Sequence, residues 1–167
     1  MKRSEINNAM KGALELFKEY KIVLPKFARL TPEEWKTKGD EVQEIKDNML
    51  GWDITDFGNG DFNKVGLFLI TLRNGNQKNQ AKYPKPYAEK LMIVREGQIT
   101  PMHYHWSKME DIINAGGGNL IIKLYNTTPD NKLDDSDVSV VIDGVKHVYP
   151  AGTEICLNPG QSVTLTP

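Results

Sequence analysis

The chain is poor in cysteine and in long apolar runs. Its 167 residues contain one cysteine, Cys156, so no intrachain disulfide can form. The apolar neighbours Ile155 and Leu157 predict that this thiol is a small buried hydrophobe rather than a nucleophile. No apolar run approaches the roughly 20 residues that span a membrane, and the N-terminal residues carry charges where a secretory signal is apolar. We therefore expect a cytoplasmic protein.

An excess of charge of either sign is also lacking. The chain has 21 Lys and Arg against 22 Asp and Glu, a net charge of -1, so no overall field attracts nucleic acid or an anionic membrane. Its content of 39% hydrophobic and 26% charged residues is typical of a globular protein with one sizeable core. Histidine is scarce as well: there are three, and two of them, His103 and His105, are two residues apart.

The apolar pattern changes near residue 50. Apolar residues at three- and four-residue steps predict a helix over 4–20 with Ser4 as its N-cap, and Thr31 followed by Pro32 predicts a second, short helix. Beyond residue 50, short alternating runs end in glycine and asparagine turns, one of them an expected hairpin at Asp143 and Gly144. We expect strands at residues 65–73, 89–95, 119–125, 138–142, 145–149, 153–157 and 162–166. The prediction is a mainly β protein: a helical segment, 1–50, packed on an antiparallel sandwich or barrel, 51–167.

The most informative segment holds the paired histidines. If it is a strand, His103 and His105 point to the same face, and Glu110 needs only a tight turn to join them. Two imidazoles and one carboxylate bind Mn, Fe, Co, Ni or Zn and leave coordination positions open. The alternative is an exposed histidine pair without a metal.

The spacing G-x5-H-x-H-x4-E-x6-G, formed by Gly97, His103, His105, Glu110 and Gly117, resembles the first motif of the cupins. The longer segments 88–120, 149–153 and 157–167 resemble the D-lyxose isomerase family. This resemblance implies a cupin-type jelly-roll barrel that is preceded by one or two N-terminal helices. It also implies a manganese-dependent aldose-ketose isomerase, which interconverts D-lyxose with D-xylulose and, in some members, D-mannose with D-fructose. By analogy with cupins we expect a homodimer.

Carried over from that family, the metal ligands are His103, His105 and Glu110. A fourth ligand, a histidine, is expected shortly after Pro167, so we expect the chain to represent part of a longer enzyme, with 162–166 as a strand at a free sheet edge. The histidine of the second cupin motif would fall at Ile155. We expect His147 to be a surface or rim residue rather than its replacement.

Two residues are candidates for the chemistry. Lys90 is a single charge among the apolar residues that follow it, and the resemblance favours an acid-base or substrate-contacting role; the alternative is an exposed edge lysine. Glu110 can assist proton transfer besides binding metal. Trp52, Tyr104 and Trp106 are candidates either for pocket walls or for the core.

Three other functions remain open. They are a phosphosugar isomerase, an Fe(II) cupin dioxygenase and a sugar-binding module without catalysis. No glycine-rich phosphate loop is visible and only Arg3, Arg29, Arg73 and Arg95 occur, which favours an unphosphorylated pentose or hexose.

Overall fold

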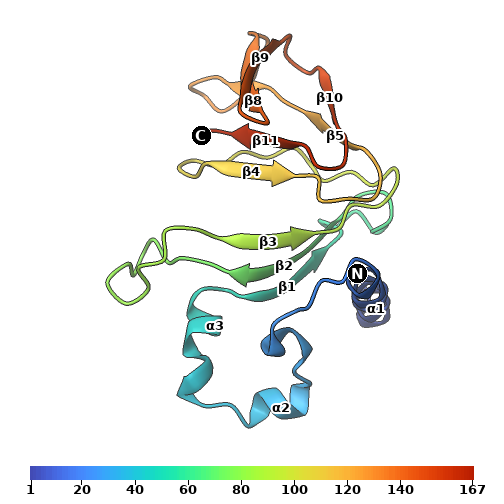
Figure 1. The fold of residues 1–167 in the computed structure, drawn as a ribbon, viewed down its shortest axis with the longest axis vertical. Helices are drawn as coiled ribbons and strands as arrows, with labels where there is room; N and C mark the ends of the chain where they lie inside the picture. Colours follow the sequence, from blue (N-terminus) through green and yellow to red (C-terminus); the bar gives the residue numbers. More distant parts are fainter. The chain divides into compact units, whose positions relative to one another are not determined.

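The computed structural model describes all residues, 1–167, and is mainly β with helices at its N-terminal end (Figure 1). Its contacts divide it into two compact units, Met1–Pro101 and Met102–Pro167. All the helices belong to the first unit, and none is long and apolar enough to cross a membrane.

The first unit begins with α1, Arg3–Glu19, close to the helix that the apolar pattern predicts. Its N-cap is Lys2 rather than Ser4, because the Glu5 carboxylate accepts a hydrogen bond from the Lys2 backbone N–H and so fixes the first turn two residues earlier. The second predicted helix is confirmed as α2, Pro32–Lys36, where Thr31 and Glu34 form a reciprocal capping box. Three short elements complete the helical part: the 3₁₀ turns η1 (Lys26–Arg29) and η2 (Asp40–Val42), and α3 (Gln43–Asp47).

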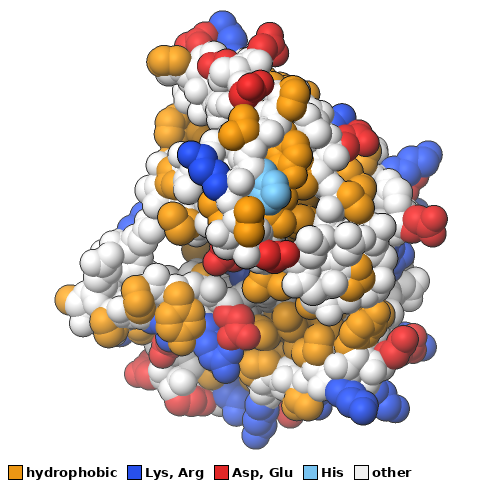
Figure 2. Space-filling view, turned by 45° about the horizontal axis from the view of Figure 1, so that its top comes forward, with side chains coloured by type: hydrophobic (Ala, Val, Ile, Leu, Met, Phe, Trp, Pro, Cys, Tyr) orange, Lys and Arg blue, Asp and Glu red, His pale blue; other side chains and the backbone are white.

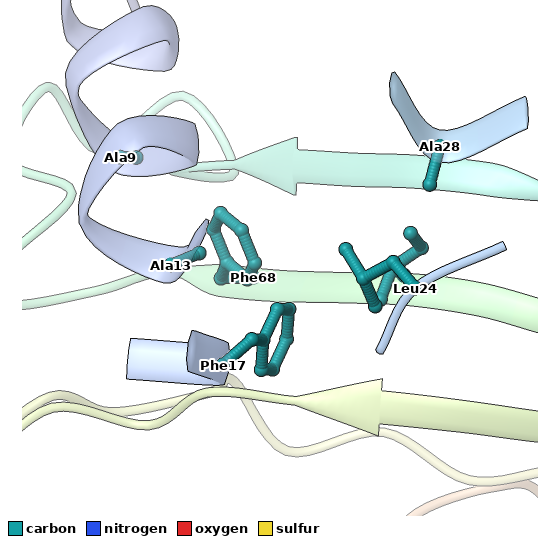
Figure 3. Packing of buried hydrophobic residues seen from close by; sticks show 7 residues of the cluster. Ala9, Ala13, Phe17, Leu24, Ala28 and Phe68 are labelled. Atoms are coloured by element: carbon teal, nitrogen blue, oxygen red, sulfur yellow. The ribbon is translucent and has the colours of Figure 1, made fainter. Parts of the chain in front are cut away.

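A three-stranded antiparallel sheet follows, with strand order β1-β2-β3. Its strands are β1 (Gly51–Thr55), β2 (Leu67–Arg73) and β3 (Glu89–Met92). One face of this sheet packs against α1, where Ala9, Ala13 and Phe17 meet Phe68 of β2 (Figure 3). Small residues on the helix allow this close approach, and the large side chains fill the space between helix and sheet.

Trp52 on β1 belongs to this core. Its ring lies 6.4 Å from that of Phe17 and 5.5 Å from that of Phe68, and its indole N–H donates to the Ala28 carbonyl at 2.9 Å. Of the two roles open for Trp52, the structure therefore supports core packing.

The loop between β2 and β3 is tied back to α3. Asp47 at the end of α3 accepts hydrogen bonds from the Tyr83 hydroxyl at 2.6 Å and from Lys82 Nζ at 3.2 Å. The bond from Tyr83 foremost, then one from the Gln43 side chain and that of Lys82, lower the pKa of Asp47 from 3.8 to about 2. Gly75 lies so close to the Lys85 carbonyl that a β-carbon there would collide with backbone.

The second unit consists only of strands and their connections. They are β4 (Glu110–Ile113), β5 (Leu120–Lys123), β6 (Asn126–Thr127), β7 (Leu133–Asp134), β8 (Val138–Ile142), β9 (Val145–Tyr149), β10 (Glu154–Leu157) and β11 (Ser162–Leu165). Four of them form a sheet in the order β4-β11-β8-β9, while β5 pairs with β10 and β6 with β7. The larger sheet and the β5/β10 pair enclose an apolar cluster of Val140, Ile142, Ile155, Leu157 and Val163. These sheets are antiparallel, as predicted, and do not join into a closed barrel.

The β8–β9 hairpin forms at the predicted place. Asp143 and Gly144 both have positive φ, 47° and 80°, as a two-residue hairpin turn of the favoured hand requires.

Two expectations about the second unit are wrong. The last strand, β11, is not at an edge: it lies between β4 and β8, and Val163 at its centre is fully buried. Cys156 is exposed rather than buried, because strand alternation turns Ile155 and Leu157 inward and the thiol outward. Apolar side chains also reach the surface among charged ones (Figure 2). Val145 and Val148 of β9 are among the exposed large apolar residues.

Candidate functional site

The paired histidines lie on an irregular segment that leads into β4. The sequence predicts a strand here, but residues 101–109 have no strand pairing, and the regular structure begins only at Glu110. The prediction is wrong because alternation alone does not supply a neighbouring strand, without which the backbone hydrogen bonds cannot form. The two side chains nevertheless meet: the rings of His103 and His105 have centroids 5.1 Å apart and are steeply inclined at 76°.

Glu110 joins this pair from the first position of β4. Its carboxylate is partly buried, with 30% of the side chain exposed, and Oε2 lies 3.5 Å from Nε2 of His105. The other carboxylate oxygen, Oε1, accepts a hydrogen bond from Nζ of Lys108 at 2.9 Å. The structure thus brings His103 next to His105, and His105 next to Glu110.

Lys108 was missed by the reasoning from sequence. A signal was available, because residues two apart in an extended segment point to the same side, and Lys108 precedes Glu110 by two. The ligand pattern consists of histidines and a carboxylate and so does not include this cation.

The donor types fit a first-row divalent ion, since two imidazoles and a carboxylate are available on one short segment. In the arrangement that the structure shows, no three histidine, cysteine, aspartate or glutamate side chains are grouped so that they could hold a metal ion.

The strand that carries Glu110 is firmly held. β4 pairs along its length with β11, Glu110 opposite Leu165, and the Thr164 hydroxyl donates to Asp111 at 2.6 Å. At the start of β11, Asp143 accepts hydrogen bonds from the Ser162 backbone N–H at 2.7 Å and from its hydroxyl. The backbone bond in particular lowers the pKa of Asp143. Glu110 is thus positioned by a sheet, whereas the histidines are positioned by a loop.

A second network anchors the other end of β4. Asn114, only 6% exposed, donates from Nδ2 to the carbonyls of Gly118 and Leu157, both at 2.9 Å. Its own backbone N–H donates to Gln161 and its carbonyl accepts from Gly160. The turn after β4 is therefore bonded to the turn before β11, which fixes the register of the two strands.

His147 lies too far from Glu110 to share an ion with it. It stands on β9 opposite Val140, its ring stacked on Tyr149 at 5.9 Å. The strand pairing places it on the same sheet face as Glu110, but three strands away, which is about 14 Å at a strand spacing of about 4.8 Å.

Lys90 lies in the first unit on β3, paired with Thr71. Its neighbour Leu91 packs into the core against α1, so alternation places Lys90 on the opposite face of the sheet, where it is exposed. Lys90 therefore has no part in the apolar core.

The aromatic residues beside the histidines are exposed. Trp106 is 74% and Tyr104 42% exposed, and their rings meet edge to face with centroids 4.9 Å apart. Neither is a core residue, so both remain available for contact with a ligand.

Comparisons with known proteins cover the entire chain. The family model described as D-lyxose isomerase matches residues 1–167. The chain is similar to a D-lyxose/D-mannose isomerase of Escherichia coli O157:H7, with 46% identity over 168 aligned residues that span all of this chain and 74% of the relative. A D-lyxose/D-mannose isomerase of Serratia proteamaculans is 45% identical, over all of this chain and 73% of that protein. The chain therefore belongs to the D-lyxose isomerase family, and with it to the sugar isomerases.

Proposed function

We propose that this protein interconverts D-lyxose with D-xylulose and D-mannose with D-fructose, using a divalent metal ion, most readily Mn(II). The observation that carries the proposal is the 45–46% identity, over the whole chain, to two proteins named D-lyxose/D-mannose isomerase. The metal part is supported by the donor types and by the contacts of His105 with His103 and with Glu110.

In this proposal His103, His105 and Glu110 hold the ion. When bound, a divalent ion supplies Lewis-acid stabilisation of the negative charge that develops on the sugar oxygens. Glu110 is suited to a fixed ligand because β4 and β11 hold its backbone. The histidines, on a segment without strand pairing, can adjust their rings at small cost.

The reaction also needs a group that carries a proton between C1 and C2 of the open-chain sugar. We assign Lys90 an acid-base or hydroxyl-contacting role, since it is an exposed cation on the sheet face that does not pack against α1. Glu110 is the second candidate for proton transfer, through a carboxylate oxygen not engaged in metal binding.

The proposal is tested by incubating the protein with D-lyxose or D-mannose and Mn(II) without oxygen and measuring the ketose formed. We expect turnover of both sugars, abolished by a chelator and restored by added Mn(II). Binding of sugar without turnover would identify a binding module instead, and a requirement for Fe(II) with consumption of oxygen would identify a dioxygenase.

The role of Lys90 is tested with Lys90→Met. We expect kcat to fall by about 100-fold or more if the ammonium takes part in proton transfer. The matched control is Lys64→Met, since Lys64 is an exposed lysine of the same unit that pairs only with Asp61 within one loop. Equal activities of the two variants would remove Lys90 from the reaction.

The reaction in deuterated water distinguishes two paths for the hydrogen between C1 and C2. Deuterium from solvent in the product supports proton transfer, whereas its absence supports a hydride shift.

A further inference from the structure

Two asparagines of the chain are followed directly by glycine, at Asn59–Gly60 and at Asn74–Gly75. In this dipeptide the backbone nitrogen of the second residue attacks the asparagine side chain most easily, because glycine has no side chain to obstruct the approach. Both pairs belong to the first unit, so their surroundings can be compared directly.

Asn74 is held by its neighbours. Its Nδ2 donates to the Asn48 carbonyl at 3.0 Å, and its own carbonyl accepts a hydrogen bond from Nδ2 of Asn48, which is only 1% exposed. The Lys85 carbonyl closes off one side of Gly75, where it occupies the place of a β-carbon. The Asn74 side chain can therefore turn towards the Gly75 nitrogen only if this packed region opens.

Asn59 has no such restraint. It is exposed, and its side-chain amide makes no hydrogen bond within the protein. Gly60 has a φ of 87° and no atom within 4 Å of the place of a β-carbon, so the turn is open around the attacking nitrogen. One bond opposes the reaction, since the Gly60 N–H donates to Asp56 Oδ2 at 3.1 Å. A single bond in a turn of exposed residues opens at small cost.

We propose that Asn59 is a site of spontaneous deamidation through a succinimide, and that the fold protects Asn74 from the same reaction. The Gly60 nitrogen gives up its proton to hydroxide and forms a bond to Cγ of Asn59. The bond between Cγ and Nδ2 breaks, and ammonia leaves with a proton from water. Water then opens the ring at either carbonyl, which leaves aspartate or isoaspartate at position 59. One water is taken up and one ammonia is released, without oxidation or reduction.

Aspartate before glycine can close the same ring, but only from its protonated form. The chain has one such pair, Asp143–Gly144. The Asp143 carboxylate accepts hydrogen bonds from the Ser162 backbone N–H at 2.7 Å and from the Ser162 hydroxyl at 3.0 Å, and the backbone bond in particular lowers its pKa. Asp143 should therefore stay unchanged under conditions that convert Asn59.

Conversion of Asn59 changes its loop in two ways. It adds a negative charge between Asp56 and Asp61, which are both carboxylates. Isoaspartate also lengthens the main chain by one carbon between Gly58 and Gly60, whose N–H groups both donate to the buried Asp56 at 3.1 Å. We expect the converted protein to behave as a more acidic species in ion exchange and to melt at a lower temperature.

The experiment is incubation of the full chain at mildly alkaline pH, with conversion of each asparagine measured by mass spectrometry of its proteolytic peptide. We expect Asn59 to convert at least about tenfold faster than Asn74 in the folded protein. The matched control is the same chain unfolded in guanidinium chloride, where the two rates should agree within about threefold because both asparagines then precede glycine in an unfolded chain. Equal rates in the folded protein, or conversion of Asn59 only after unfolding, would overturn the proposal.

The variant Asn59→Gln tests the ring itself. Glutamine keeps the exposed amide but has to close a six-membered ring, which is much slower, so the acidic species should not form in this variant. An acidic species that forms at the same rate in Asn59→Gln would place the reaction elsewhere in the chain and overturn the assignment to Asn59.

Discussion

The replacement of Asn114 by alanine should destabilise the second unit strongly. Nδ2 of Asn114 donates to the carbonyl of Leu157, a residue with no exposed surface, and to that of Gly118, both at 2.9 Å. Alanine leaves the Leu157 carbonyl buried without this donor, which costs about 1–3 kcal/mol, and the loss of the second bond costs about 0.5–1.5 kcal/mol. Together we expect the free energy of unfolding to fall by about 1.5–4.5 kcal/mol.

The assay is urea denaturation followed by circular dichroism, with Asn126→Ala as the control. Asn126 also donates two hydrogen bonds from Nδ2, to Ser136 at 2.9 Å and to the Asp137 carbonyl at 3.0 Å, but both are at the surface. Water can replace them, so this variant should lose about 1 kcal/mol or less. If the two variants lost equal stability, burial would not be what makes the Asn114 bonds important, and the reasoning would be refuted.

Three further predictions concern the loop of the first unit, its helix and the single thiol. The depressed pKa of Asp47 means that its stabilising contribution is present above its ordinary value of 3.8 and is lost as pH falls towards about 2. Tyr83→Phe removes the largest cause of the depression, so an NMR titration should find the pKa of Asp47 nearer 3.8; an unchanged value would contradict the assigned cause. Gly75→Ala should lower the melting temperature, because the Lys85 backbone occupies the place of the new β-carbon. Gly12→Ala, in open space on α1, should instead raise the free energy of unfolding by about 0.5–1 kcal/mol. A less stable Gly12→Ala variant together with a more stable Gly75→Ala variant would refute both expectations. Cys156 should react with a thiol reagent in the folded protein at a rate near that of a free thiol. If the thiol reacted only after the protein unfolds, its exposure would be contradicted.

The local patterns of this sequence predict the secondary structure correctly where residues close together in the chain determine it. α1 follows from the spacing of its apolar residues, α2 from the Thr31 cap, and the β8–β9 hairpin from Asp143 and Gly144. In each case the determining contacts lie within a few residues along the chain, where sequence reasoning applies.

The errors arise where distant parts of the chain decide. Whether β11 is an edge or an interior strand depends on its pairing with β4, some fifty residues earlier, which no local pattern reveals. The histidine segment alternates like a strand but has no strand beside it. Cys156 shows a different limit: the three residues 155–157 of β10 form one apolar run in the sequence, because the outward residue between the two buried ones is itself a small hydrophobe.

The candidate site was predictable in its donors but not in their contacts. His103, His105 and Glu110 stand out by residue type and spacing, and the structure places His105 beside each of the others. The Lys108 ammonium at the Glu110 carboxylate depends on side-chain geometry around the start of β4, which spacing alone does not determine.

The interior position of β11 has a consequence for synthesis of the protein. During translation, β4, β8 and β9 leave the ribosome before β11, yet β4 has a hydrogen-bonded neighbour only in β11. The β8–β9 hairpin can form early, whereas the strand that carries Glu110 must wait about fifty residues for its partner, because a pairing so distant along the chain closes a long loop. Until Ser162–Leu165 emerges, the nascent chain presents β4 as a strand without its hydrogen-bonding partner, which leaves its backbone groups open to pairing with another chain.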